Sequence, residues 1–389
     1  MSDELETYAS TPWLTWPDGF AVGAEDRRAL FVLSALRAIT PRRLIELAAE
    51  RGTAATVLQC IRDGRAGSDG DRRFADSLDA DSIAARAAAC GARFVTWGSS
   101  EYPPQLEHIH DPPAAIYVIG ERLPDVTSAV AIVGARRCSA LGRDQATDLG
   151  RALGLAGITV VSGAARGIDA AAHEGALSVA GATLAVLGCG VDVAYDPGGR
   201  GLLRRIGARG TIVTEFAPGT QPEPRNFPAR NRIVAGLCRA TVAVEGAVGS
   251  GSLITAEHAM EFGREVYAVP GSVANPMAYV PLQLIRDGAG MIRGADDLLH
   301  DLGVEHAVTS APEALEGPEL RALEALVGPT LPEHVASSLR VDVPRAVTLL
   351  MELELRGFVR SAGGRYEPTL KGASASAPAR RNGTASRRA

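Results

Sequence analysis

The sequence predicts an α/β protein built around a Rossmann-like, mostly parallel sheet. Glycine is abundant, with 43 residues, and aromatic residues make up only 5% of the chain. This composition is typical of α/β proteins with many tight turns. Between residues 129 and 295, short apolar runs alternate with helical patterns. Those runs are apolar throughout, as expected for strands whose two faces are both covered by helices.

The 389 residues, of which 46% are hydrophobic, are enough for two or three domains. Changes of pattern along the chain divide it into five parts. We expect a helical domain (SAM-like or helix-hairpin-like) at 1–88, an extended Rossmann-like domain at 89–300, a linker at 301–317, a winged helix at 318–370 and a disordered basic tail at 371–389.

The first domain has apolar residues at helical spacing from Glu25 to Arg86, and Thr40-Pro41 begins a new helix within it. Helical hairpins of this kind sometimes bind the DNA backbone through a glycine-rich turn. Residues 38–41 read Ala-Ile-Thr-Pro instead. We therefore favour a packing or partner-binding role over DNA contact.

Two strand-like segments, 93–97 and 114–119, lead into the central region. The strands expected there are 130–133, 158–161, 183–186, 211–213, 241–244 and 266–269. In parallel sheets of this type, ligands bind at the carboxyl ends of the strands. The segments that follow these strands are therefore the candidates for a binding site.

The segment 318–370 is predicted to form three helices and a hairpin, the order of a winged helix. It carries 7 acidic and 6 basic residues, and the third helix, near 343–355, is flanked or occupied by Asp342, Glu352 and Glu354. A helix that reads a DNA groove should be basic. Contact with a partner or with the core is therefore favoured over DNA reading.

The tail from Lys371 onward holds five basic residues and no acidic one, and is expected to be disordered. Two roles stay open for it: added non-specific affinity for phosphate, or solubilisation.

The net charge of −5 excludes a protein coated in positive charge, so any nucleic-acid site must be a local patch. Every basic residue except Lys371 is arginine, whose planar donors suit phosphate. The five cysteines are widely spaced and predict reduced thiols, with neither a disulfide framework nor a zinc site. No signal region or membrane-spanning apolar run is visible, so a soluble cytoplasmic protein is expected.

Four segments that follow predicted strands have chemistry suited to phosphate. In 134–142, Gly134 permits a tight turn before a helix and Arg136 adds positive charge. In 162–169, two glycines allow close approach of the backbone, Ser162 offers a hydroxyl and Arg166 a charge. Asp169 is assigned to capping the helix, with orientation of an arginine as the alternative. His173, one turn along, is interpreted as a packed histidine and not as a catalytic base.

The third segment, residues 227–232, is the most informative one. Phe227 offers a face for stacking a base, while Arg230 and Arg232 are suited to clamping phosphates at the head of a helix. When this segment is considered by itself, the alternative is an ordinary helix start whose arginines only contact solvent. In the fourth, 249–255, backbone amides and hydroxyls at another helix start are expected to form an anion-binding nest.

Taken in order, these segments read Gly-x-Arg-x-x-Ser-x-x-Gly, Ser-Gly-x-Ala-x-Gly-Ile-Asp, Phe-Pro-x-Arg-Asn-Arg and Ser-Gly-Ser-Leu-x-Thr-Ala. In this order they resemble the DNA-processing protein A family, also called DprA or Smf. The resemblance is strong over residues 92–299 and looser in the flanking domains. One departure is the apolar loop 278–282, where the family usually has a Ser-x-Gly-x-Asn run.

The resemblance implies a single-stranded-DNA-binding protein of natural transformation. Such a protein protects incoming strands, dimerises through its Rossmann-like domain and helps to load the RecA recombinase. It implies no cofactor, no metal and no catalytic residue. The residues it places in the strand-binding pocket are Gly134, Arg136, Ser139, Ser162, Gly163, Arg166, Gly167, Phe227, Arg230, Asn231, Arg232, Gly251 and Ser252.

An enzyme is the alternative, because the same scaffold also resembles nucleotide phosphoribohydrolases of the lysine-decarboxylase-like group. Those enzymes carry Pro-Gly-Gly-x-Gly-Thr-x-x-Glu with a catalytic carboxylate, and the corresponding position here is Thr255. A threonine cannot supply that carboxylate chemistry. Hydrolysis is therefore disfavoured and a binding function is expected, although Glu245 and Glu257 remain nearby and keep the alternative open.

Overall fold

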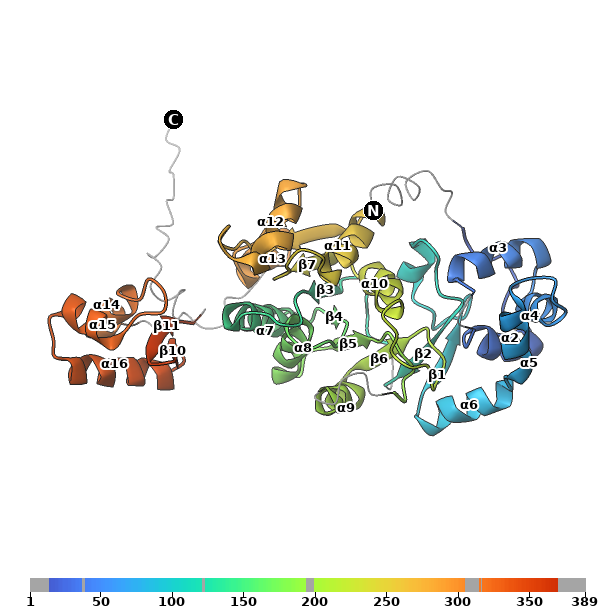
Figure 1. The fold of residues 1–389 in the computed structure, drawn as a ribbon, viewed down its shortest axis with the longest axis horizontal. Coiled ribbons are helices and arrows are strands. Elements are labelled where there is room, and N and C mark those ends of the chain that lie inside the picture. Colours follow the sequence, from blue (N-terminus) through green and yellow to red (C-terminus); the bar gives the residue numbers. More distant parts are fainter. Residues whose placement is uncertain are drawn as a thin grey trace, which may run out of the picture. The chain divides into compact units, whose positions relative to one another are not determined.

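A computed structural model describes residues 14–36, 39–120, 123–193, 199–304, 315 and 317–369 (Figure 1). By its internal contacts the chain divides into two compact units, Met1–Val304 and Glu305–Ala389. The tail 371–389 and most of the predicted linker lie outside the described residues. Because the first unit includes both the N-terminal helices and the sheet, the predicted boundary near residue 88 stays a prediction.

The N-terminal helices begin at side chains that cap them. Thr40, Thr53, Ser68 and Asp79 each accept a hydrogen bond from a backbone N–H of the helix that follows. Their apolar faces share one core, which includes Phe20, Ile45 and Ile61. These helices are α2 (Ala24–Leu33), α3 (Pro41–Arg51), α4 (Ala54–Arg62), α5 (Asp69–Ser77) and α6 (Ala80–Ala89).

The described strands of the first unit form one nine-stranded sheet in the order β1-β2-β6-β5-β4-β3-β7-β8-β9. The strands from β3 onward pair in parallel, while β1 and β2 join the edge of the sheet as antiparallel strands. The prediction of a mostly parallel sheet is confirmed. The strands are β1 (Arg93–Thr96), β2 (Ala115–Ile119), β3 (Val130–Val133), β4 (Val160–Ser162), β5 (Thr183–Val186), β6 (Thr211–Thr214), β7 (Ala240–Ala243), β8 (Glu265–Ala268) and β9 (Gly290–Met291).

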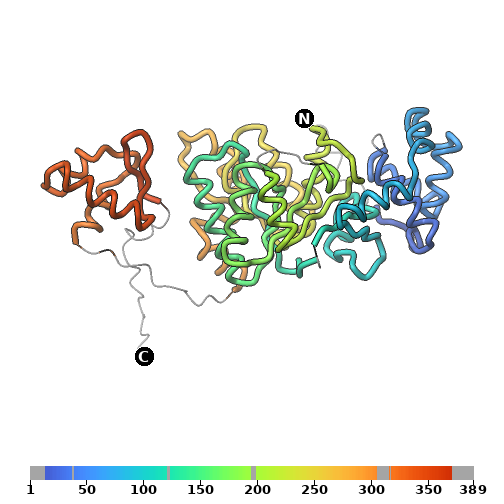
Figure 2. The backbone as a smooth tube through the Cα atoms, turned by 90° about the horizontal axis from the view of Figure 1, so that it is seen from below, coloured from blue at the N-terminus to red at the C-terminus, as the bar shows by residue number. Residues whose placement is uncertain are grey.

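Alternate residues of the strands supply two separate cores, one on each face of the sheet. Val130 and Ile132 of β3 pack into one core, and Ala131 and Val133 pack into the other. This alternation follows from the period of two along a strand. In both views of the backbone, the N-terminal helices lie beside β1 and β2 (Figures 1 and 2).

Helices cover both faces of the sheet. Helices α7, α8 and α13 contribute Leu149, Ile168 and Leu299 to one core, while α10 and α12 contribute Ile233 and Leu284 to the other. The helices of this region are η1 (Pro104–His108), α7 (Ala140–Leu155), α8 (Ile168–Ser178), α9 (Arg200–Arg209), α10 (Asn226–Gly236), α11 (Gly251–Glu261), η2 (Pro276–Ala278), α12 (Tyr279–Arg286) and α13 (Ala295–Asp301).

The order of the strands reverses at β3, because the chain continues from β3 to β4 on one side and returns to β7 on the other. In sheets of this kind, such a reversal opens a crevice at the carboxyl ends of the strands. The segments after β3, β4 and β7 are three of the four segments that the sequence singled out.

The second unit contains three helices followed by a hairpin, the predicted order of elements. They are α14 (Pro318–Glu324), α15 (Pro332–Leu339), α16 (Val343–Leu355), β10 (Val359–Ala362) and β11 (Arg365–Pro368). The two strands are antiparallel, and Leu323, Val335, Leu350 and Phe358 are among the residues of a core of its own. Assignment of this unit as a winged helix stays a prediction.

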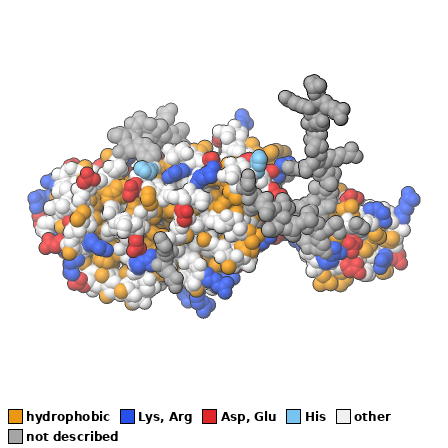
Figure 3. Space-filling model, turned by 180° about the vertical axis from the view of Figure 1, so that it is seen from behind, with side chains coloured by type: hydrophobic (Ala, Val, Ile, Leu, Met, Phe, Trp, Pro, Cys, Tyr) orange, Lys and Arg blue, Asp and Glu red, His pale blue; other side chains and the backbone are white. Residues whose placement is uncertain are grey.

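Charged side chains of both signs are interspersed over the face drawn in Figure 3. None of the five cysteines, all of which lie in the described residues, forms a disulfide. Among the described residues, no helix combines the length and the apolar character needed to cross a lipid bilayer.

Candidate nucleic-acid interface

A cavity of about 550 Å³ lies at the carboxyl ends of β3, β4 and β7. We call it the sheet-edge cavity. The loops after β3 and β4 form part of its wall, and the first turns of α10 and α11 form the rest. Its lining residues are Val133, Gly134, Arg136, Gly163, Ala165, Asp169, Pro224, Phe227, Pro228, Arg230, Asn231, Val234, Gly249, Ser250, Gly251, Ser252, Ile254 and Thr255.

Arg136 and Phe227 lie side by side in the lining. The guanidinium carbon of Arg136 lies 5.1 Å from the centroid of the Phe227 ring, within the range of a cation–π contact. Arg136 is exposed and Phe227 is half-buried. A cation beside an aromatic face is suited to a ligand that has both a phosphate and a base.

Arg230 is buried at the bottom of the lining, with only 5% of its surface exposed. Its Nη1 donates to the carbonyl oxygens of Gly163 (3.0 Å) and Val186, and its Nε donates to Oδ1 of Asn231 (3.3 Å). A Cβ on Gly163 would lie 2.4 Å from Nη2 of Arg230. A larger residue at position 163 would therefore have to displace the Arg230 guanidinium or the Asp169 carboxylate.

Asp169 supplies the acidic group of the lining. Burial raises the pKa of its carboxyl to about 6, although Arg230 and the N–H groups of Ala165 and Gly163 act in the opposite direction. The carboxylate is therefore largely ionised at pH 7 and offsets part of the Arg230 charge. The capping assignment is wrong in its detail: Gly167 is the N-cap of α8, and Asp169 lies in its first turn and accepts from the N–H of Ala165 (3.4 Å).

His173 is fully buried, and its Nδ1 lies 2.7 Å from Oγ1 of Thr183. Burial, and then the positive charge of Arg230, lower the pKa of its imidazole to about 3. The histidine is therefore neutral at physiological pH. This is a packed residue, as the sequence indicated.

The start of α11 completes the wall opposite Arg136. Ser250 caps the helix through its Oγ, which accepts from the N–H of Ser252 (3.4 Å) and lies 2.8 Å from the Ser252 hydroxyl. Nδ2 of Asn231 donates to the carbonyl oxygen of Gly251 (3.1 Å), so α10 and α11 are held together. The N-termini of α8 and α11 add the partial positive charge of helix dipoles.

Thr255 lies in the same wall and is buried. Its Oγ1 donates to the carbonyl oxygen of Gly251 (3.3 Å). The position at which related hydrolases carry a glutamate thus holds a hydroxyl that is bonded within its own helix. Glu245 is also engaged, because its carboxylate accepts from the N–H (2.8 Å) and the hydroxyl (2.6 Å) of Ser139.

Eight of the thirteen predicted residues line the cavity: Gly134, Arg136, Gly163, Phe227, Arg230, Asn231, Gly251 and Ser252. The other five, Ser139, Ser162, Arg166, Gly167 and Arg232, do not. Ser139 caps α7 and binds Glu245, while the buried Ser162 donates to the carbonyl oxygen of Ile132 (2.6 Å). Arg166 is exposed on the same loop as Gly163.

Gly167 has a purely conformational reason to be glycine. Its φ is +85°, and a Cβ at this position would lie 2.2 Å from the carbonyl oxygen of Ala135. The close approach holds the loop after β4 against the loop after β3. Gly167 therefore shapes the cavity without lining it.

Arg232 lies on the opposite side of α10 from the sheet-edge cavity. Its guanidinium binds the Glu215 carboxylate through two hydrogen bonds of 2.7 Å, and its Nε donates to the carbonyl oxygen of Asp111 (2.9 Å). Both side chains are nearly fully buried. The structure therefore separates Arg232 from Arg230 and gives it the geometry of a buried structural ion pair.

The lining residues that sequence reasoning left out are mostly neighbours of residues it named. Pro224, Pro228 and Val234 belong to α10 or the turn before it, and Gly249 and Ser250 belong to the predicted nest. Asp169 was assigned to capping, with orientation of an arginine as the alternative, and the charge of Arg230 does act on its carboxyl. Its burial was the missing signal, and burial is not visible in the local pattern.

Residues 278–282, which the sequence suggested as a loop, are the end of η2 and the first turn of α12. The N–H of Val280 donates to the carbonyl oxygen of Gly246 (2.8 Å), and the N–H of Gly246 donates to the carbonyl oxygen of Met277 (2.7 Å). Ala278 and Val280 are buried, while Tyr279 is exposed. None of the five residues lines the sheet-edge cavity.

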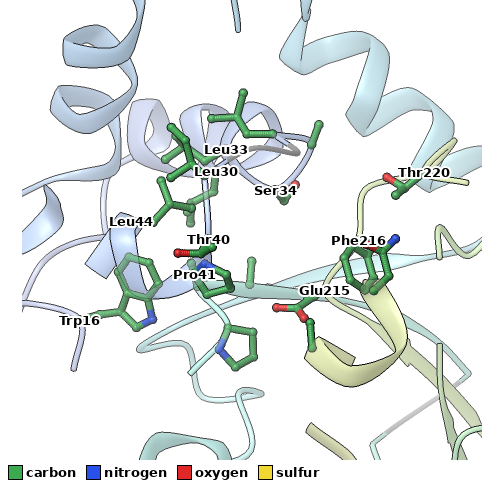
Figure 4. A pocket seen from close by; sticks show the side chains of 18 of the residues that line it. Trp16, Leu30, Leu33, Ser34, Thr40, Pro41, Leu44, Glu215, Phe216 and Thr220 are labelled. Atoms are coloured by element: carbon green, nitrogen blue, oxygen red, sulfur yellow. The ribbon is translucent and has the colours of Figure 1, made fainter. Parts of the chain in front are cut away.

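A second cavity, of about 250 Å³, lies on the other side of α10. Leu30, Leu33 and Leu44 of the N-terminal helices line it with Trp16 and Phe216 (Figure 4). Glu215 reaches its edge, but that carboxylate is bound to Arg232. An apolar lining of this kind is unsuited to a phosphate.

A family model described as DNA recombination-mediator protein A matches residues 93–303. The chain belongs to this family. Its membership confirms the resemblance that the four loop segments indicated. The matched residues include all nine strands of the sheet and every residue of the sheet-edge cavity.

Protein Smf of Escherichia coli is 38% identical over 282 residues, which are 69% of this chain and 75% of that protein. The alignments with curated relatives span between 54% and 75% of the relatives' lengths.

Two solved structures of DNA processing protein A resemble the chain. The protein from Streptococcus pneumoniae has a TM-score of 0.60 at 31% identity, and the match covers 73% of this chain and 99% of that one. The protein from Helicobacter pylori has a TM-score of 0.50 at 26% identity, with 55% and 97% covered. The latter structure concerns a mode of single-stranded DNA binding.

Proposed function

We propose that this protein binds single-stranded DNA as a recombination mediator and that the sheet-edge cavity holds part of the strand. The observation that carries the proposal is the contact between exposed Arg136 and half-buried Phe227 in a lining that also contains Arg230. Guanidiniums attract phosphates and the ring offers a stacking surface, so the contacts address features common to all sequences. Sequence preference is accordingly weak, and duplex binds worse because its bases remain stacked.

Membership of the mediator family supports the choice of partners. A mediator delivers single strands to a recombinase, so RecA is the proposed protein partner and natural transformation the proposed setting, in the cytoplasm. The homodimer, formed through the Rossmann-like domain, presents two cavities to one strand. Two linked sites raise the affinity by effective concentration.

The proposed role is binding and not catalysis. Thr255 stands in place of the hydrolase glutamate, and the Glu245 carboxylate is occupied by Ser139. The wild-type protein is incubated with nucleoside monophosphates. We expect it to release no more base or ribose phosphate than the Thr255→Val control releases. Turnover that this substitution abolishes would restore the phosphoribohydrolase alternative.

The test is a titration of labelled single strands and matched duplex across a salt series. Arg136→Ala and Phe227→Ala are expected to weaken single-strand binding, and Arg136→Ala is expected to lower the salt slope by about 0.7 if one phosphate contact is lost. Phe227→Ala should leave the slope unchanged, because stacking releases no counterion, and should cost about 1–3 kcal/mol.

Arg137→Ala is the matched control. Arg137 is the exposed neighbour of Arg136 and does not line the cavity. Its removal should change single-strand affinity far less than that of Arg136. Equal losses for the two arginines, or equal affinity of the wild-type chain for single strands and duplex, would contradict the cavity model.

A further inference from the structure

Helix α16 of the second unit has apolar residues on two opposite faces. The inner face, Ala346, Leu349, Leu350 and Leu353, is buried in the core of the unit. The outer face is formed by three apolar residues, Pro344, Met351 and Leu355, and by Thr348, whose hydroxyl donates to the carbonyl oxygen of Pro344 (3.0 Å); all four are exposed. Met351 is 53% exposed and Leu355 is 88% exposed. Helices α14 and α15 lie on the inner side in Figure 1.

The outer residues form a continuous stripe. Their spacing is i, i+4, i+7 and i+11, and at about 100° per residue they fall within an arc of about 60°. The centre of that arc is diametrically opposite the buried face. Single exposed apolar residues need no explanation, but an aligned row of them over three turns is the pattern of a helix that packs against another helix.

The charges beside the stripe are arranged asymmetrically. Arg345 and Glu352, both exposed, lie on one flank, seven residues apart. Val347 and Glu354 lie on the other flank, where Glu354 accepts hydrogen bonds from the N–H and hydroxyl of Ser361. A partner helix must therefore place a negative group opposite Arg345 and a positive group opposite Glu352.

A second copy of the same helix meets this requirement in one orientation. If two copies cross antiparallel about a twofold axis, Pro344 faces Leu355 and Thr348 faces Met351 of the second copy. The flanks then bring Arg345 opposite Glu352 of the second copy, and the symmetry repeats the pair. A parallel arrangement would instead set Glu352 beside Glu354 of the second copy.

We propose that the outer face of α16 pairs with the same face of a second copy of this chain, antiparallel and about a twofold axis. Four core side chains per helix are far fewer than the roughly 20–30 residues per side of a stable interface. The pairing alone is therefore weak and concentration-dependent. It gains strength wherever two copies are already held close together. It does not depend on the strand-binding function of the first unit.

The first experiment uses two full-length single-cysteine additions, Thr348→Cys and Met351→Cys, which carry tags of different size. They are oxidised mildly, separately and as a mixture. The antiparallel register predicts that the mixed disulfide between the two variants forms faster than either homodimer. Wild type measures the background from the native cysteines, and Val327→Cys, 96% exposed and outside α16, measures random collision.

A dominant disulfide between two copies of the Thr348→Cys variant would indicate a parallel pair and overturn the proposal. So would mixed disulfides that form no faster than those of Val327→Cys. Both results are interpretable because the substituted positions are exposed, and circular dichroism checks that each variant keeps its helix content.

The second experiment tests the charge pattern in the same mixture. Arg345→Glu and Glu352→Arg, each introduced alone, place like charges opposite each other and should slow the mixed disulfide severalfold at low salt. The double reversal restores opposite charges and should recover the rate to within about twofold. If neither single reversal has an effect, the face binds something other than its own copy, and the proposal fails.

Discussion

Arg232 and Glu215 behave as one buried unit at the level of single residues. Arg232→Ala leaves the Glu215 carboxylate buried without its partner, which typically costs about 3–5 kcal/mol. Replacing both residues by apolar ones of similar volume, as in Arg232→Met with Glu215→Leu, should recover much of that loss. Urea unfolding of the three variants checks this, with Arg137→Ala as the exposed control. A double variant as unstable as Arg232→Ala would contradict it.

Asp169 is expected to make the proposed strand binding depend on pH. Its pKa is raised to about 6, so the carboxyl becomes neutral as the pH falls from 7.5 to 5.5, while the guanidiniums of Arg136 and Arg230 stay charged. His173, with a pKa of about 3, does not titrate in this range. Affinity for a polyanion should therefore rise on acidification, by about threefold to tenfold.

The control for this pH effect is Asp169→Asn, which has no proton to gain. It should bind at pH 7.5 as the wild type binds at pH 5.5, and its affinity should change less across the range. Fluorescence anisotropy at constant ionic strength measures both. If the two proteins show the same pH profile, a different group is responsible.

At the level of elements, the loops after β3 and β4 depend on one close backbone contact. Gly167→Ala combines a left-handed φ with a Cβ 2.2 Å from the carbonyl oxygen of Ala135. Gly157 also has a positive φ (+73°) but open space around its Cβ position, so Gly157→Ala measures the conformational cost alone, about 1 kcal/mol. Chemical denaturation should show a clearly larger loss for Gly167→Ala, and similar losses would mean that the contact is unimportant.

The sheet and the loops at its carboxyl edge could be predicted because strands buried on both faces are apolar throughout. The loops and helix starts that form the cavity wall were also predictable, because parallel strands bring their carboxyl ends together at one edge of the sheet. The side of α10 on which each arginine lies was predictable in principle. Residues two apart on a helix point to nearly opposite sides, so Arg230 and Arg232 cannot line one pocket.

Other roles were not visible in the sequence. The Glu245 carboxylate accepts a hydrogen bond from the Ser139 hydroxyl, although the two residues are more than one hundred positions apart in the sequence. No local pattern reveals this bond. The same is true of the Ser162 hydroxyl, whose partner is the neighbouring strand. A hydroxyl that looks available for a ligand is often satisfied by a distant carbonyl or carboxylate, because buried polar groups seldom lack a partner.

For the molecule as a whole, the first unit holds the entire sheet-edge cavity. A chain that ends at Val304 should therefore bind single strands with an affinity within about threefold of the full-length protein at 200 mM salt, where distant basic groups are screened. Titration of both forms checks this. A loss of tenfold or more would assign strand contacts to the second unit or to the tail.

The Glu215–Arg232 pair has a consequence for how the protein can change over generations. Because each member alone would leave a buried charge, a substitution at one position is tolerated only with a matching substitution at the other. Arg230 differs in that part of its binding comes from the backbone carbonyl oxygens of Gly163 and Val186, which are present whatever the side chains there. In an alignment of mediator proteins, position 232 should therefore vary jointly with position 215.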